Sequence, residues 1–136
     1  ALGNLEEMKL LKPGSLILLK GVSFAPDRHV ARPESADTLE KLFVVLRDNP
    51  MLKISIEGHV CCIPNAPDAL DVDNNEAALS VNRAKEIYNF LVRKGIDSKR
   101  LRYVGFGKRK PIVQFEKTEE DANKNRRVEI RITENQ

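Results

Sequence analysis

Two stretches with the apolar spacing of amphipathic helices, set between stretches with strand-like alternation, constrain the fold of this chain most. The first covers residues 34–49, and Asn49-Pro50 ends it, because proline disfavours a helical residue before it. Its apolar positions are Leu39, Leu42, Phe43 and Leu46. The second covers residues 75–95 and ends at Gly95. Its apolar positions are Leu79, Ala84, Ile87, Tyr88 and Leu91. Each helix needs another layer against which to bury its apolar face.

Four stretches are predicted to be the strands of that second layer. Residues 15–24 are rich in aliphatic side chains and follow a turn with the sequence KPG. Residues 52–59 alternate apolar and polar side chains, which predicts a half-buried strand. Residues 101–107 and 126–133 complete the set, and residues 97–101 are predicted to form a short helical turn. The order predicts an α+β fold in which two helices pack on one face of a small, mixed, four-stranded sheet.

Size and composition indicate one soluble domain. The chain has 136 residues, of which 41% are hydrophobic and 32% charged, and no apolar run approaches the ~20 residues that span a bilayer. The net charge of +3 is too small to argue for nucleic acid by itself. We expect a single domain over residues 1–136, with its core at about 13–133. Because the chain starts at Ala1, we also expect it to be a trimmed piece of a larger protein.

Several short motifs occur in an order that resembles a known family. They are Gly58-His59, Leu79-Ser80-x-x-Arg83-Ala84, Gly105-Phe106-Gly107 and Asn125-Arg126-Arg127-Val128-Glu129. Together they resemble the OmpA C-terminal-like peptidoglycan-binding domain, which also occurs in peptidoglycan-associated lipoprotein and in flagellar stator proteins. The resemblance covers about Pro13 to Thr133, nearly the whole chain. Each motif alone is weak, whereas four in the right order and spacing are specific.

The resemblance implies non-catalytic binding of the diaminopimelate in the peptidoglycan stem peptide, without a cofactor or a metal. That residue carries an ammonium and a carboxylate, so its site needs an anion and an arginine fork. Arg83 matches the arginine of the family. It lies near the start of a helix, where the helix dipole disfavours a cation, and this mismatch itself suggests a function. We therefore expect a periplasmic domain that attaches an outer-membrane or envelope protein to the cell wall.

The sequence departs from the family at the residue that should bind the ammonium. Cys61 stands where the family has an aspartate, and the loop that follows is longer than expected. We expect an acid of that loop to replace it, namely Asp68, Asp71 or Asp73, with Asp71 more important than Asp68. Arg126 and Arg127 alternate along a strand. One of them can therefore contact ligand while the other pairs with an acid.

Other interpretations of the same residues remain open. Each loop aspartate can simply be solvated, and Arg83 can form a surface ion pair with Glu76 or Glu86. Ser80 is expected to bond locally, and His59 to be a core or strand-end histidine that bonds a loop backbone. Cys61 and Cys62 can be either reduced or joined in a strained ring.

Two kinds of metal site and two other functions are weaker alternatives. The sequence DVDNNE offers oxygen ligands for calcium but lacks the glycine and spacing of an EF-hand. Two histidines and two adjacent cysteines do not have the spacing of a zinc site. Basic and aromatic residues interleave over residues 99–110, which has some likeness to a nucleic-acid-binding segment. A protein-interaction module that binds no peptidoglycan is the remaining alternative.

Overall fold

The computed structural model describes residues 5–22, 24, 28–60, 68, 78–107, 118 and 127–135. Its strands and two long helices alternate along the chain as the sequence predicts. They are β1 (Leu16–Leu18), α1 (Ala36–Asp48), β2 (Lys53–His59), α2 (Leu79–Arg93), β3 (Leu101–Gly107) and β4 (Arg127–Glu134). Three short 3₁₀ segments accompany them, η1 (Leu5–Leu10), η2 (Pro33–Ser35) and η3 (Ser98–Arg100). The helical turn expected at residues 97–101 is thereby confirmed, one residue shorter at each end.

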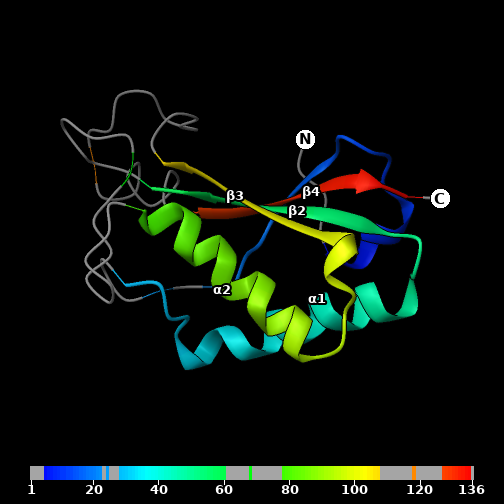
Figure 1. Cartoon of the computed structure of the whole chain (residues 1–136), viewed down its shortest axis with the longest axis horizontal. Coiled ribbons are helices and arrows are strands. Elements are labelled where there is room, and N and C mark those ends of the chain that lie inside the picture. The colour runs from blue at the N-terminus through cyan, green and yellow to red at the C-terminus, as the bar shows by residue number, and fades with distance from the viewer. Residues whose placement is uncertain are drawn as a thin grey trace.

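The four strands form one mixed sheet in the order β1-β4-β2-β3. β1 and β2 each pair antiparallel with β4, whereas β3 pairs parallel with β2 at the edge of the sheet. Both helices lie on the same face of the sheet (Figure 1). The predicted α+β fold, with two helices on one face of a four-stranded sheet, is therefore confirmed.

The core lies between the helices and the sheet and uses the apolar positions that the sequence pattern marks. Its fully buried side chains come from every layer. They include Ile17, Leu42, Leu46, Ile54, Ile56, Ile87, Leu91, Ile130 and Ile132. Fully burying one such side chain stabilises the fold by about 1.5–3 kcal/mol. No helix within the described ranges has the length and apolar character needed to cross a membrane.

The first strand is much shorter than the predicted residues 15–24. After Leu19, whose N–H still donates to the carbonyl of Val128 (3.0 Å), the chain turns at Lys20 and Gly21. Gly21 has a φ of +87°, a conformation that side-chain-bearing residues rarely adopt. Leu19 and Val22, on either side of the turn, still pack on the core. The aliphatic composition therefore continues past the end of the strand, and composition alone overestimates the length of the strand.

The prediction of a half-buried β2 is wrong, because both faces of this strand are buried. Ser55, Glu57 and His59 point away from the helices, yet they are only 5%, 4% and 2% exposed. Charged neighbours on β4 cover them, as described below. Alternating polarity therefore marked the two faces of the strand correctly but not their exposure.

Arg100 joins the end of α1 to the start of β3. Its guanidinium donates to the carbonyls of Leu46 (2.7 Å), Asn49 (2.9 Å) and Leu52 (3.1 Å). The last carbonyls of a helix have no partner within the helix, so this side chain satisfies groups that would otherwise cost stability. Partial burial lowers the pKa of Arg100 from its ordinary value, and the guanidinium remains a cation.

Candidate functional site

The first turn of α2 lies directly on the sheet because two glycines leave room for it. Gly58 of β2 and Gly105 of β3 are paired neighbours. A Cβ atom at Gly58 would run into the carbonyl oxygen of Ser80, and one at Gly105 would lie 2.5 Å from the backbone nitrogen of Val81. The two glycines of the motifs therefore fix how closely the helix that carries Arg83 approaches the sheet.

Asp68 and Ser80 form a buried polar cluster at the start of this helix. Asp68 Oδ1 accepts from the backbone N–H of Ser80 (2.9 Å) and Oδ2 accepts from its hydroxyl (2.6 Å). The Ser80 hydroxyl in turn accepts from the N–H of Gly107 at the end of β3 (2.9 Å). Asp68 thus caps α2 from outside the helix. Ser80 has the structural role that the sequence indicates, but its partners lie 12 and 27 residues away.

Arg83, one turn further along α2, is held by the segment before η2. Its Nε–H donates to the carbonyl of Arg28 (2.8 Å), and its guanidinium carbon lies 4.9 Å from the centroid of the Phe24 ring. A β-bridge pairs Phe24 with Ala31. Arg83 is only 9% exposed, so it is a buried residue, whereas the surface ion pair considered from the sequence would have left it exposed.

Asp68 and Arg83 are therefore brought to the same turn of α2. Asp68 binds Ser80, and Ser80 and Arg83 are three residues apart, which places them on one side of a helix. The arrangement has fixed groups of both signs, as recognition of a zwitterion requires. Asp71, Asp73 and Arg126 lie outside the described residues, as do both cysteines and the calcium-like sequence at residues 71–76.

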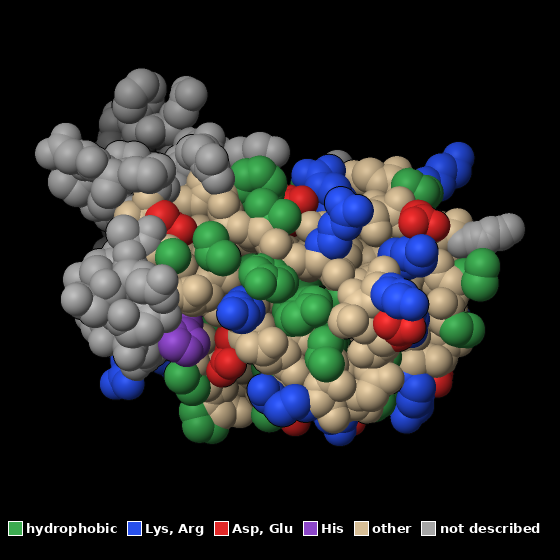
Figure 2. Space-filling view, in the orientation of Figure 1, with side chains coloured by type: hydrophobic (Ala, Val, Ile, Leu, Met, Phe, Trp, Pro, Cys, Tyr) green, Lys and Arg blue, Asp and Glu red, His purple; other side chains and the backbone are tan. Residues whose placement is uncertain are grey.

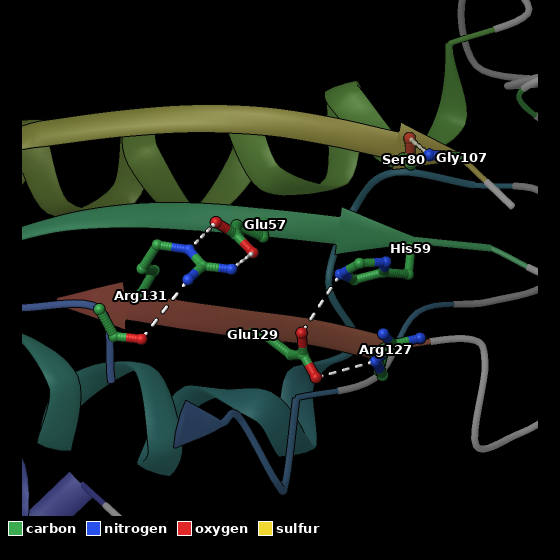
Figure 3. Close-up of polar contacts among 8 residues, drawn as sticks. Glu57, His59, Ser80, Gly107, Arg127, Glu129 and Arg131 are labelled. Carbon is green, nitrogen blue, oxygen red and sulfur yellow. Dashed lines mark hydrogen bonds and ion pairs between the residues drawn. The ribbon is translucent and has the colours of Figure 1, made fainter. Parts of the chain in front are cut away.

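A second polar cluster crosses β2 and β4 on the face opposite the helices (Figure 3). Glu57 and Glu129 are directly opposite each other in the antiparallel register, a pairing that is unfavourable for like charges. Each has its own arginine. Arg131 Nε lies 2.7 Å from Glu57 Oε2, and Arg127 Nε lies 3.0 Å from Glu129 Oε2. The arginines offset the repulsion and the burial of both acids.

His59 completes this cluster, and its environment differs from the expected bond to a loop backbone. Its Nε2 lies 3.4 Å from Glu129 Oε1, and its ring stacks on Phe106 with centroids 5.3 Å apart. At that distance the polar contact is long, and neither ring nitrogen makes a well-aligned hydrogen bond within the described part of the chain. The His59 imidazole and the Arg127 guanidinium lower the pKa of Glu129 to about 2, against the effect of burial.

The charges of this cluster disfavour a metal ion. One ligand atom each from Glu57, His59 and Glu129 lies within 4.8 Å of the others, and all three residues are buried. The two glutamates are already neutralised by Arg127 and Arg131. A dication would leave two uncompensated charges in a buried site, which is costly. The pairing also assigns Arg127 to an acid, as the sequence predicts for one of the two adjacent arginines.

The basic side chains in the described part of residues 99–110 have different environments. Arg100 is committed to the carbonyls at the end of α1, while Lys99 and Arg102 are exposed. On the face shown in Figure 2, Lys and Arg side chains are spread among acidic and apolar ones and do not form a stripe. This distribution argues against a nucleic-acid interface built on the described residues of that face.

Three features of these two clusters were not predicted from the sequence. The Phe24 ring was not singled out, because nothing in the chain order links it to the Arg83 guanidinium. Glu57 directly precedes the Gly58-His59 motif and Glu129 ends the motif that contains Arg127, but only the strand register places the two acids opposite each other. Gly58 and Gly105 were noted as motif residues, but their role in admitting α2 depends on the strand register.

These features define the class of the protein as a small α+β domain with a candidate binding site at the start of the second helix. The model of the OmpA family matches residues 23–126, and the chain belongs to this family. The OmpA-like domains of this family are structural and not enzymatic.

Individual relatives agree with this assignment. The chain is 27% identical over 129 residues to the probable lipoprotein YiaD of Escherichia coli (strain K12), covering 93% of this chain and 55% of YiaD. The cell wall anchor of the T6SS from Pseudomonas aeruginosa has a TM-score of 0.68 at 24% identity, covering 88% of this chain and 79% of that one. The peptidoglycan-associated lipoprotein from Burkholderia pseudomallei has a TM-score of 0.65 at 22% identity, covering 82% and 87%. These two structures show the shared fold, and the chain spans little more than half the length of YiaD.

Proposed function

We propose that this domain binds the peptide stem of peptidoglycan without covalent chemistry and anchors a larger envelope protein to the cell wall. Family membership supports the proposal, as do the names of two structural neighbours, a cell wall anchor and a peptidoglycan-associated lipoprotein. In this proposal the domain lies in the periplasm and is attached to the outer membrane through the rest of its protein. Residues 1–136 then form one domain of that protein.

The ligand group in this proposal is the side chain of diaminopimelate, with its ammonium and its carboxylate. Arg83 meets the carboxylate through charge-assisted hydrogen bonds. Asp68 meets the ammonium, because a carboxylate oxygen that already accepts one hydrogen bond can accept a second. The observation that carries the proposal is that a guanidinium and a carboxylate are both fixed and buried at the first turn of α2.

The remaining candidate residues have no assigned role in the proposed site. Arg127 is paired with Glu129, so the proposal does not place it at the ligand. Asp71, Asp73 and Arg126 lie outside the described residues, so their contribution to binding stays a prediction. We place the ammonium at Asp68, although the sequence alone ranks Asp71 first, because Asp68 is tied to the helix that carries Arg83.

A pull-down with purified sacculi, competed by free diaminopimelate, tests the proposal. Arg83→Ala should reduce binding on the order of 100-fold, since two charge-assisted hydrogen bonds are lost. Arg83→Lys should recover little, because lysine keeps the charge but not the planar fork. Arg93→Ala is the matched control, since Arg93 is an exposed arginine at the other end of the same helix.

The result is interpreted only for variants whose circular dichroism matches that of the unmodified domain. Undiminished sacculus binding by folded Arg83→Ala would remove Arg83 from the site. A greater loss in Asp71→Asn than in Asp68→Asn would move the ammonium to Asp71. An unmodified domain that binds no sacculi would refute peptidoglycan binding and favour a protein-interaction module.

A further inference from the structure

We propose that Phe24 is a positioning residue that presets the Arg83 guanidinium and thereby sets the preference for a stem residue with a side-chain carboxylate. The inference rests on the proposed function and names what determines its selectivity. It starts from two contacts on one side chain, the Phe24 ring against the guanidinium and the Arg28 carbonyl on Nε.

The two contacts constrain different aspects of the Arg83 side-chain conformation. The hydrogen bond of 2.8 Å from Nε to the Arg28 carbonyl fixes the orientation of the guanidinium. The ring, 4.9 Å from the guanidinium carbon, favours the cation at that position through its negative face. A free arginine side chain would lose rotamer freedom on binding, whereas one that is already ordered loses much less.

The same hydrogen bond determines which edge of Arg83 can meet a ligand. Because Nε–H is directed at a protein carbonyl, a two-point contact with a carboxylate has to use the Nη1–Nη2 edge. Such a contact is geometrically strict, so its strength depends on how well the guanidinium is held. A ligand group without a carboxylate cannot form this contact, so its affinity does not depend on how firmly the guanidinium is held.

Phe24 is held from the interior of the protein. A β-bridge pairs it with Ala31, and both residues pack on the core at the edge of the apolar cluster. The Phe24 ring is therefore supported from the protein interior and is placed to hold Arg83. Loss of the ring should loosen the guanidinium without removing any hydrogen-bond donor from the site.

The test compares two synthetic stem peptides that differ only in carrying meso-diaminopimelate or lysine, which lacks the second carboxylate. For Phe24→Leu we expect the preference for the diaminopimelate peptide to fall roughly tenfold, while affinity for the lysine peptide changes less than about twofold. Phe24→Tyr keeps an aromatic face and should restore the preference. Phe24→Met keeps most of the volume without the ring, and it serves if the leucine variant does not fold.

Phe43→Leu is the matched control. Phe43 is also a partly buried phenylalanine beneath cationic side chains, but it lies against Lys94 beyond the opposite end of α2. Its replacement should leave the preference between the two peptides unchanged. A ligand-free measurement accompanies the binding: the Nε–H resonance of Arg83 in the free protein should lose its ring-current shift and exchange faster in Phe24→Leu.

The outcomes separate this inference from the proposed function. If the unmodified domain does not prefer the diaminopimelate peptide, the proposed function fails, whatever Phe24 does. If that preference exists and is unchanged in Phe24→Leu, the inference fails alone. Equal losses for both peptides would make Phe24 a wall of the site or a part of the fold, and would also overturn the positioning role.

Discussion

Replacing Gly105 by alanine tests whether α2 lies as close to the sheet as the structure places it. An alanine Cβ would lie 2.5 Å from both the Val81 backbone nitrogen and the Ser80 hydroxyl oxygen, whereas ordinary contact begins at 3.4 Å. The first turn of the helix would have to retreat by about 0.9 Å, and a backbone atom cannot turn aside as the end of a side chain can.

The size of the effect follows from three contributions. Overpacking of this kind costs about 1–3 kcal/mol. Weakening the bonds of the Ser80 hydroxyl to Asp68 and Gly107 adds about 1 kcal/mol for each bond. Alanine in place of glycine in a strand gains about 0.5–1 kcal/mol. We therefore expect a net loss of about 2–4 kcal/mol in the free energy of unfolding, or roughly 10 °C in Tm.

Urea denaturation followed by circular dichroism measures this loss, with an unchanged m-value as evidence that only stability is affected. Thr133→Ala, at an exposed position of β4, should stay within about 0.5 kcal/mol of the unmodified protein. Adding Val81→Ala to Gly105→Ala removes the side-chain part of the clash but leaves the backbone nitrogen, so only partial recovery is expected. Stability equal to the unmodified protein in Gly105→Ala would refute the close approach.

Two further predictions concern parts of the fold away from α2. The pKa of Glu129 is lowered from 4.5 to about 2, so its ionised form stabilises the fold fully above pH 4.5. The free energy of unfolding should fall by about 3 kcal/mol as the pH falls from 4.5 through 2. In Glu129→Gln, the free energy of unfolding measured with urea should depend much less on pH over this range. The same pH dependence in the variant and the unmodified protein would contradict the assignment. Arg100→Met should cost about 2–4 kcal/mol by urea denaturation, because three carbonyls lose a charged donor. The exposed Arg93→Met should cost little, and equal effects of the two changes would show that the end of α1 does not depend on Arg100.

Much of the fold could be predicted from the sequence because its signals are local. The apolar spacing of α2 and the alternation of Val128, Ile130 and Ile132 each lie within a few turns or residues of chain, so periodicity alone identifies them. The limits of β1 depended on a turn at Gly21, whose positive φ is not marked by the aliphatic pattern around it.

The environment of the charged residues could not be predicted in the same way. Glu57 was assigned to solvent because it alternates with isoleucines, yet its partner Arg131 lies 74 residues away. Arg83 and the Arg28 carbonyl are 55 residues apart. Such pairs depend on strand register and on how a loop returns to a helix, neither of which leaves a periodic signal in one sequence. Motif resemblance identified Arg83, but only the structure relates it to Phe24.

The proposed site accounts for the departure from the family at Cys61 through the position of Asp68. In that proposal the ligand ammonium needs a carboxylate at the first turn of α2, and the place in the chain from which the carboxylate comes is secondary. Asp68, 12 residues before Ser80, occupies both the backbone N–H and the hydroxyl of Ser80. A carboxylate held this way stabilises the N-terminus of α2, whose first N–H groups have no partner within the helix, and it lies one turn from Arg83. We therefore propose that Asp68 takes the place of the aspartate that the resemblance implies at the end of a strand, provided that Gly58 and Gly105 bring α2 to the sheet.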